Sequence, residues 1–478
     1  MNYWIIAYIM GWVLNFEGAF LLLPAVTALV YGEKEGYAFL ICSLLSFVAG
    51  GLIVLKKPSN KRFYAREGFI ICSMTWIVIS LVGAIPFVIT GVLPNFVDAL
   101  FEIVSGFTTT GSSVITDLTP VPHCILIWRS FSHWIGGMGV LVFILAILPL
   151  FGGVDMHLMR AESPGPSVGK LVPNVKKTAS YLYKIYLGMT VVQFVILLLS
   201  GMNLFDSICI TFGTAGTGGF GIHNDSCLGY TLPQQTIIAV FMLLFGINFN
   251  VYFLIVRKKV KEIFNIEEVK WYLIIVFGAV AAIVINWGDT ENLYYSIHHA
   301  FFSVASVITT TGYGTVDFNI WPMFSKFVIV MIMFIGACAG STGGGMKVSR
   351  ILIYVKTVKK EIVGMIHQKS IKILKMDGKI VEHSVIRNAN VYLVSYLMIM
   401  AISLLIVALD NFDFETSFTA VAATFNNIGP GLGKVGPTGN FSEFSNLSKI
   451  VLIFDMLAGR LEIFPMLLLF SRATWSRK

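Results

Sequence analysis

The sequence predicts an all-α protein that crosses a membrane many times, and three observations predict this class. Of its 478 residues, 56% are hydrophobic and only 13% are charged, about half the charged share of an ordinary soluble domain. Long apolar stretches recur along the chain, and basic residues gather in every second connection between them. A soluble enzyme and a disordered chain are therefore excluded. The net charge of +8 reflects membrane topology, and we expect no nucleic acid as a partner.

Ten apolar segments are long enough to cross a bilayer as helices. A hydrocarbon core of about 30 Å needs roughly 20 helical residues, and a helix satisfies its own backbone groups in lipid. The first segment lacks a basic leading region and exceeds a signal-peptide core, so we expect it to be retained. The predicted spans are 3–30, 37–55, 68–92, 127–150, 181–202, 233–256, 271–287, 323–355 (interrupted), 390–409 and 448–470.

The basic residues predict the orientation of these spans. Most of the 34 lysines and arginines follow the second, fourth, sixth, eighth and tenth spans. Because positive loops stay in the cytoplasm, we expect a multi-pass protein of the cell inner membrane with both termini cytoplasmic. Acidic residues dominate the outer connections of the last eight spans, where they concentrate cations, although the same topology bias explains them equally well. The outer basic residues are Lys34, Arg129, Lys326, Lys434 and Lys449.

One short unit recurs four times after the second span. Residues 108–112 read TTTGS and recur as TTTGY at 309–313, with looser copies AGTGGF at 215–220 and NNIGP at 426–430. Before each copy lies an amphipathic stretch too short to span. Each unit is therefore a span, a short re-entrant helix, a glycine-centred loop and a second span. The leading pair occupies 1–56, and the four units occupy 57–150, 151–256, 257–362 and 363–478.

Four re-entrant loops indicate one central pore. Non-helical backbone at membrane depth is tolerated only where protein or water covers it, and four loops can meet this condition around one axis. Threonine and glycine loops can direct oxygens at a cation, and glycine allows positive φ. The C-terminal ends of the short helices carry partial negative charge. A single TTTG is usually a turn, whereas four copies in register favour a pore with pseudo-fourfold symmetry.

The eighth span is interrupted by glycines. Residues 340–345 read GSTGGG, and because each glycine costs a helix about 1 kcal/mol relative to alanine, we expect the helix to unwind below the loops. A phosphate loop is excluded because Met346 stands where that motif needs lysine. Close packing of small residues is the open alternative. We favour a moving gate, which comprises Gly340, Ser341, Thr342, Gly343, Gly344, Gly345 and Lys347.

Arg460 is a further gate candidate. It stands near the middle of the predicted span 448–470, where an arginine is costly and is a functional candidate by default. We expect its charge beside the gate loop, where it raises the barrier to cations. A structural ion pair with Asp455 or Glu462 is the alternative. Catalysis is not expected, because the adjacent pair His298-His299 has no metal-binding context.

These motifs resemble the Trk/Ktr/HKT superfamily of potassium transporters, and the two leading spans are most similar to its Trk branch. The resemblance covers nearly the whole chain and implies a potassium filter at the four loops, the only place where the metal ion binds. The second loop departs from the usual TGGFS by Gly221 after Phe220. The implied filter residues are Thr109, Thr110, Gly111, Gly216, Thr217, Gly218, Thr310, Thr311, Gly312, Asn427, Ile428 and Gly429.

The resemblance also implies the partners of the chain. Potassium is the one expected cofactor, and no organic cofactor is expected in this chain. The subunit is expected to be a homodimer in the lipid bilayer, controlled by a cytoplasmic nucleotide-binding regulatory subunit of RCK type. Residues 356–379 are a candidate dock for that subunit, although anionic lipid explains their charge equally well. A sodium-coupled or weakly selective monovalent cation transporter of the same fold is the alternative.

Overall fold

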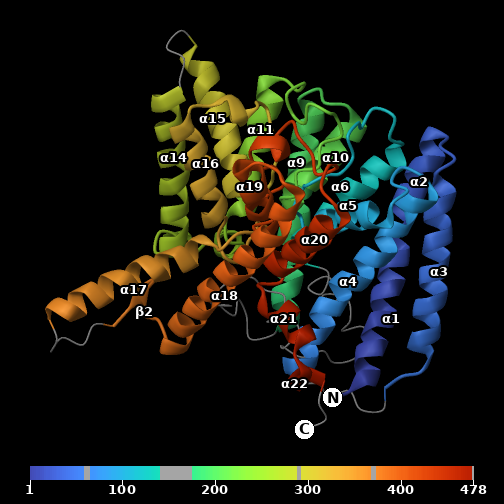
Figure 1. Cartoon of the computed structure of the whole chain (residues 1–478), viewed down its shortest axis with the longest axis horizontal. Helices are drawn as coiled ribbons and strands as arrows, with labels where there is room; N and C mark the ends of the chain where they lie inside the picture. The colour runs from blue at the N-terminus through green and yellow to red at the C-terminus, as the bar shows by residue number, and fades with distance from the viewer. Residues whose placement is uncertain (59–64, 140–174, 288–291, 368–372, 476–478) are drawn as a thin grey trace.

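The protein is an all-α polytopic membrane protein, as its sequence predicts. The computed structural model describes residues 1–58, 65–139, 175–287, 292–367 and 373–475. Within them, six helices are long and apolar enough to cross a membrane, and a bent pair adds a seventh. Both termini lie at one end of the molecule (Figure 1). The second half of the predicted span 127–150 lies outside the described residues. So do Arg160 and Lys170, two of the basic residues after the fourth span that predict the orientation.

The helices fall into a leading pair and four units of similar layout. The leading pair of spans comprises α1 (Tyr3–Phe20) and α2 (Leu22–Tyr31), which together form the first span, and α3 (Gly36–Leu55), which forms the second. The first unit comprises α4 (Ala65–Ile89), α5 (Phe96–Phe107) and α6 (His123–Gly137). The second comprises α9 (Val175–Leu199), α10 (Leu204–Gly216), α11 (Leu232–Gly246) and α12 (Asn250–Val256), and the short α13 (Val260–Ile263) follows before the third unit's first long helix.

The last two units repeat this order and carry longer additions. The third unit comprises α14 (Glu267–Trp287), α15 (Leu293–Ile308), α16 (Met323–Ile335) and α17 (Val348–Ile366). The fourth comprises α18 (His383–Val407), α19 (Phe414–Phe425), α20 (Asn446–Arg460), α21 (Phe464–Phe470) and α22 (Arg472–Trp475). Strands β1 (Lys375–Met376) and β2 (Lys379–Ile380) form a small hairpin before α18. Its Asp-Gly turn at residues 377–378 has positive φ at both positions, as a tight hairpin requires.

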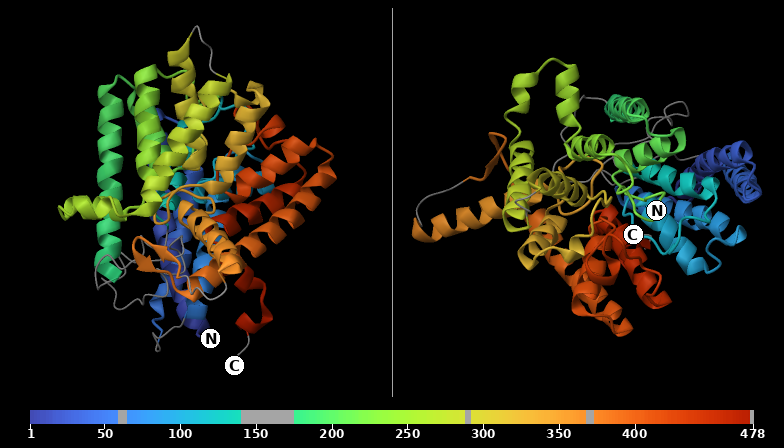
Figure 2. Two further views of the ribbon diagram at one scale, coloured as in Figure 1. Left: turned by 90° about the vertical axis from the view of Figure 1, so that its left-hand side faces the viewer. Right: turned by 90° about the horizontal axis from the view of Figure 1, so that it is seen from above.

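The four units close into a ring around the short helices. The short helices α5, α10, α15 and α19 each contact the inner helix of their own unit, and each also contacts the inner helix of the preceding unit. The ring closes because α20 of the fourth unit contacts α5 of the first. Figure 2 shows the units arranged around a common centre, with α1 and α3 at one edge.

All four short helices begin with the same kind of cap. In each, the side chain of an asparagine or aspartate accepts a hydrogen bond from a backbone amide of the first turn. Such a cap stabilises a helix by about 1 kcal/mol. It also fixes where each helix starts, so that all four C-terminal ends reach the centre of the ring. The capping residues are Asn95, Asn203, Asn292 and Asp413.

Two predicted spans are not continuous helices, which corrects the sequence prediction for 233–256 and 448–470. Helix α11 ends at Gly246, and α12 runs at 94° to it. Here the Asn248 side chain accepts a hydrogen bond from the Asn250 amide and so favours a turn. Helix α20 ends at Arg460, because Glu462 and Ile463 have positive φ and Pro465 has no amide hydrogen to donate.

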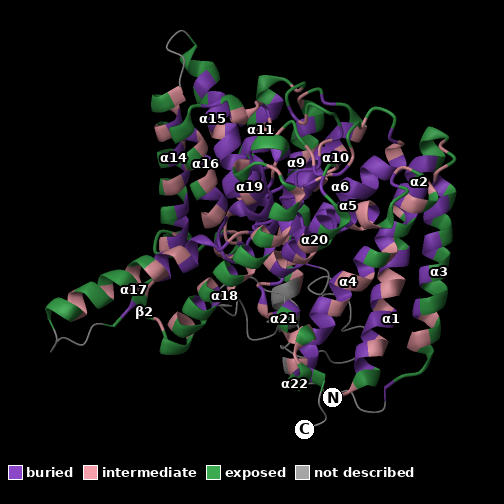
Figure 3. Cartoon of the chain, in the orientation of Figure 1, coloured by how far each residue is buried: buried purple, intermediate pink, exposed green. Residues whose placement is uncertain are grey.

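Buried side chains concentrate where the ring closes, and apolar side chains also cover the outside (Figure 3). Helix α3 exposes Leu44, Leu45 and Leu52, and α14 exposes Phe277 and Ile285. Exposed leucines and phenylalanines on long helices suit a lipid environment. The centre is therefore sealed by the four units, while the outward faces are left to the bilayer.

Ion pairs and hydrogen bonds join neighbouring units near the start of the inner helices. Lys449 of α20 lies 2.6 Å from Asp98 of α5, and Lys326 of α16 lies 3.4 Å from Glu415 of α19. Between the second and third units, His298 Nε2 donates to Gln235 Oε1 at 2.9 Å. Lysines therefore neutralise part of the acidic outer side that the sequence predicts.

We predict that Lys449→Met destabilises the protein more than Lys326→Met. The Lys449 side chain is 5% exposed, against 17% for Lys326, so its loss leaves Asp98 in a less hydrated site. We expect Lys449→Met to cost roughly 2 kcal/mol and Lys326→Met less than about 1 kcal/mol. Thermal unfolding of the purified protein in detergent measures both. Equal midpoints for the two variants would contradict the argument.

Candidate functional site

The four central loops share one backbone conformation. Within two residues of its end, each short helix is followed by a residue in the left-handed region, with φ between 55° and 57°. The next amide donates to the carbonyl five residues earlier, at 2.8 Å in every unit, which is the Schellman closure of a helix. A β-branched residue in this region is strained, and such strain is typical of functional sites. The left-handed residues are Thr109, Thr217, Thr310 and Asn427.

Two residues further on, each loop has a glycine with φ between 77° and 98°. A Cβ atom on any of these glycines would collide with the backbone of the neighbouring loop. On Gly111 it would meet the Gly218 carbonyl oxygen, and on Gly429 it would meet the Thr110 carbonyl oxygen. Gly219 and Gly312 face the Thr311 and Ile428 carbonyl oxygens in the same way. The loops therefore form a closed ring in which each glycine faces a carbonyl of the next unit.

The structure corrects the predicted register of the second loop. Gly219, with φ of 77°, occupies the place of Gly111, Gly312 and Gly429. Gly218 matches the residue before the ring glycine, and Gly216 is the last residue of α10. The predicted set Gly216, Thr217 and Gly218 is therefore displaced by one residue. The TGGF motif offers two adjacent glycines, and only the backbone conformation distinguishes them.

His133 explains why the second loop has glycines at two positions where the first and third loops have threonine. A Cβ on Gly218 would collide with the His133 ring, and one on Gly216 with its carbonyl. The ring is fixed because Nδ1 donates to the Gly106 carbonyl at 2.8 Å, while Nε2 accepts from the Phe220 amide at 3.2 Å. A neutral imidazole from the first unit thus fills the space beside the second loop.

A polar cavity of about 240 Å³ adjoins the ring. All four ring glycines contribute to its wall, and most of the remaining lining comes from the loops that follow them. Asn224 joins two of these loops, because its side chain donates to Asp117 Oδ1 at 2.8 Å and accepts from the Leu118 amide at 2.8 Å. The hydrogen bonds from Asn224 and Thr119 lower the pKa of Asp117. Polar lining residues include Ser112, Ser113, Thr116, His223, Ser226, Thr438 and Asn440.

The predicted break between α16 and α17 lies directly against the ring. Gly336, Gly340 and Gly345 have φ of 73°, 70° and 76°, which a continuous helix does not allow. The Gly344 amide donates to Thr310 Oγ1 at 2.6 Å. A Cβ on Gly343 would lie 2.9 Å from the Thr309 carbonyl oxygen. Residues 340–345 therefore cover the third and fourth loops on the side away from the polar cavity.

Two cations hold this segment through backbone carbonyls. Arg460 donates to the Thr342 carbonyl at 2.8 Å and to the Gly136 and Gly137 carbonyls at 2.5 and 2.8 Å. Lys347 donates to the Gly343 and Gly344 carbonyls. Arg460 thus joins three units and caps the C-terminal end of α6, where a cation is favoured.

The two acids named as alternative partners of Arg460 have other contacts. Glu462 forms an ion pair with Arg350, and Asp455 accepts a hydrogen bond from Ser403 at 2.7 Å. Arg460 therefore lies beside residues 340–345 and contacts them through the Thr342 carbonyl, and the role of this segment as a gate stays a prediction.

The sequence prediction assigns no role in this site to several of its residues. Glu268 accepts hydrogen bonds from the Ala339 and Ser349 amides at 2.7 and 3.1 Å, so one carboxylate holds both ends of the glycine-rich segment. Arg129, predicted on the outer side, is buried in an ion pair with Glu102. The sequence signal that could have identified Glu268 and Arg129 is an ionisable residue inside or at the end of an apolar segment. Membrane proteins rarely keep such a residue without a function.

Four units, a central ring of glycines and a polar cavity are the features expected of a membrane transport protein. The chain belongs to the TrkH family of cation transport proteins, whose family model matches residues 36–477. It is 35% identical to the Trk system potassium uptake protein TrkH of Escherichia coli K12, covering 99% of this chain and 100% of that protein. It is 34% identical to TrkG of the same strain, covering 98% of both.

Solved structures give the same result. The crystal structure of the potassium transporter TrkH from Vibrio parahaemolyticus matches with a TM-score of 0.86 and 31% identity, covering 100% of both chains. The relatives are named as transport proteins, so this chain belongs to a class of transporters and not of enzymes.

We predict that Gly219→Ala disrupts the ring, whereas Gly188→Ala does not. The added methyl of Gly219→Ala meets the Thr311 carbonyl at a positive φ, while Gly188 in α9 has open space around its Cβ position. We expect Gly219→Ala to lower stability by roughly 1–3 kcal/mol, and Gly188→Ala to leave it unchanged or slightly raised. Thermal unfolding in detergent compares them. A Gly219→Ala midpoint equal to that of the wild type would contradict the assigned register.

Proposed function

We propose that this protein takes up potassium across the cell membrane, with the glycine ring as its selectivity filter. The observation that carries the proposal is the closed ring of four glycines and four neighbouring carbonyls beside a polar cavity. Backbone carbonyls can replace the water shell of a cation. The names of the relatives, which are potassium uptake proteins, support potassium as the substrate.

The proposed filter contains three residues from each loop, with one change from the sequence prediction. Gly219 takes the place of Gly216, since it has the conformation of the other ring glycines. Because each loop has one such glycine, we expect fewer ion positions than in a filter with a long row of carbonyls. The proposed set is Thr109, Thr110, Gly111, Thr217, Gly218, Gly219, Thr310, Thr311, Gly312, Asn427, Ile428 and Gly429.

Residues 340–345 form the proposed gate. They lie against the ring and are held by Arg460, Lys347 and Glu268. Two positive charges beside a cation pathway raise the barrier to conduction, and the glycines give the backbone freedom to move. In this proposal, the segment restricts flow through the pathway in the resting protein, and flow increases when its contacts with Arg460 are released.

The proposal includes the cellular setting of the subunit. We place both termini in the cytoplasm of a cell whose inner membrane holds the protein, since both lie at one end (Figure 1) and the basic loops belong there. We propose a homodimer regulated by a cytoplasmic nucleotide-binding subunit of RCK type. The names of the relatives, which refer to a Trk system, support a protein that works with other components.

Ion flux in proteoliposomes tests the proposed function. We expect the purified protein to carry potassium down its gradient and sodium far more slowly, measured as uptake of each ion under the same driving force. Empty liposomes give the background. Equal rates for the two ions would favour the weakly selective alternative, and a dependence of potassium uptake on sodium would favour the coupled one.

We predict that Arg460→Ala raises potassium flux in the same assay. The substitution removes a charge beside the pathway and the hydrogen bonds that hold Thr342, Gly136 and Gly137. The loss of a few charged hydrogen bonds, each contributing about 1.5–3 kcal/mol, favours release of the segment. Arg472→Ala, in the C-terminal α22, is the matched control. Unchanged flux in a monodisperse Arg460→Ala protein would argue against this gate.

A further inference from the structure

A buried ion pair beside the polar cavity has no place in the proposed filter or gate. Arg129 of α6 lies 2.8 Å from Glu102 of α5 through its Nε atom, and their side chains are 2% and 0% exposed. Arg129 also belongs to the wall of the cavity. A positive charge next to a cation pathway opposes conduction unless it is neutralised, so its presence there needs an explanation.

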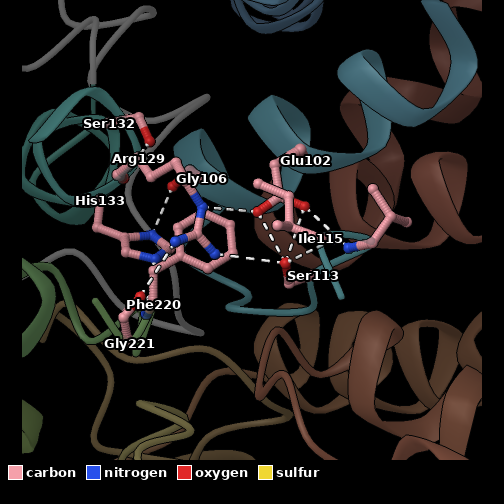
Figure 4. Close-up of polar contacts among 10 residues, drawn as sticks. Glu102, Gly106, Ser113, Ile115, Arg129, Ser132, His133, Phe220 and Gly221 are labelled. Atoms are coloured by element: carbon pink, nitrogen blue, oxygen red, sulfur yellow. Dashed lines mark hydrogen bonds and ion pairs between the residues drawn. The ribbon is translucent and has the colours of Figure 1, made fainter. Parts of the chain in front are cut away.

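Figure 4 shows that the two side chains contact both the first and the second loop. Arg129 donates to Ser113 Oγ at 3.3 Å and to the Gly221 carbonyl at 3.0 Å, and its guanidinium lies 4.1 Å from the centre of the Phe220 ring. Ser113 follows Gly111 by two residues, and Phe220 directly follows Gly219. Arg129 thus contacts the backbone segments that follow two adjacent ring glycines, Gly111 and Gly219.

Glu102 completes the contact with the first loop. Its carboxylate accepts hydrogen bonds from the Val114 amide at 2.9 Å and from Ser113 Oγ at 3.0 and 3.1 Å. Because Glu102 is part of α5, the segment after Gly111 is fixed to the short helix before it. Glu102 therefore neutralises Arg129 and also fixes the loop geometry.

The positions equivalent to Arg129 in the other units are apolar. Arg129 is the seventh residue of its inner helix, and the seventh residues of α11, α16 and α20 are Ile238, Ile329 and Leu452. All three are fully buried. The pair is therefore special to the junction between the first and second units and is not a general feature of the fold.

This junction contains the most glycine-rich of the four loops. Residues 216–221 include Gly216, Gly218, Gly219 and Gly221, and glycine has the largest conformational freedom of all residues. At the positions of Gly216 and Gly218, the other three loops have β-branched or amide side chains. Arg129, together with His133 on the Phe220 amide, supplies restraints that the side chains of the second loop do not.

We propose that Glu102 and Arg129 are positioning residues for ion selectivity, which hold the glycine-rich second loop in register with the first. The pair acts through Ser113 and Gly221, with no direct contact to the ion. This inference rests on the proposed potassium conduction. It is separate from a purely electrostatic role, in which each charge only attracts or repels cations entering the cavity.

Glu102→Gln and Arg129→Gln separate the two roles by the sign of their effects. An electrostatic role predicts opposite changes, with weaker potassium affinity after Glu102→Gln and stronger affinity after Arg129→Gln. A positioning role predicts the same change in both, a loss of potassium-over-sodium selectivity. We expect about a tenfold loss for each, the effect of one lost hydrogen bond to a charged group. The double variant is expected to lose little more than either single variant, because the two residues act as one unit.

The assay is uptake of potassium and of sodium by the full chain in proteoliposomes, with the concentration dependence of potassium uptake measured for each variant. Lys326→Met is the control, since it breaks an ion pair between units away from the cavity, and it is expected to keep wild-type selectivity. Size-exclusion chromatography establishes that each variant is monodisperse. Opposite shifts in affinity with unchanged selectivity would overturn the proposal, as would wild-type selectivity in both variants.

Two milder substitutions keep the proposal testable if the glutamine variants do not fold. Ser113→Ala removes the hydroxyl shared by the pair and leaves both charges, and Arg129→Lys keeps the charge but loses the planar fork. Each is expected to reduce selectivity several-fold, by less than the glutamine variants. Unchanged selectivity in both would reject the positioning role. If the wild type itself carries no potassium, the proposed function fails; if it does and only the variants behave unexpectedly, this inference alone fails.

Discussion

The structure depends on one constraint, which is that irregular backbone inside a membrane must be covered by other parts of the protein. Four short helices end around one ring of glycines, and each is followed by a loop whose backbone leaves the helical hydrogen-bond pattern. The chain satisfies this constraint by bringing the loops together, so that each supplies the surface that covers the next. The capped helix starts, the inter-unit ion pairs and the broken inner helices all hold the loops at that meeting point.

The broken inner helices are a consequence of the same arrangement. Helices α6, α11, α16 and α20 have 13 to 15 residues each, and they end near the ring. Arg460 binds the last carbonyls of α6, those of Gly136 and Gly137, and Lys347 binds carbonyls of the glycine-rich segment after α16. A cation that satisfies exposed carbonyls at a helix end stabilises the closed arrangement, and it also adds positive charge beside the pathway.

Much of this architecture could be predicted from the sequence, because it depends on repeated patterns. The four TTTG-like segments, the glycine-rich break at 340–345 and the position of Arg460 are visible as periodicity, composition and misplaced charge. The register of the second loop could not be predicted, since Gly218 and Gly219 are alike in sequence and differ only in φ and in the contact with His133. The breaks after Gly246 and Arg460 could not be predicted either, because apolar residues continue past both points. Hydropathy measures the composition of a segment and does not show where the direction of a helix changes. The pairing of Arg129 with Glu102 depends on the tertiary contact between α5 and α6.

The hydrogen bond from the Gly344 amide to Thr310 Oγ1 has a thermodynamic consequence. It joins a residue of the ring to a residue of the segment beneath it, so neither can change position without altering the free energy of the other. Linkage of this kind is reciprocal. A change that stabilises the ring at Thr310 alters the conformational equilibrium of the segment by a certain free energy. A change in the segment alters the equilibrium of the ring by the same free energy, so the two form one coupled equilibrium.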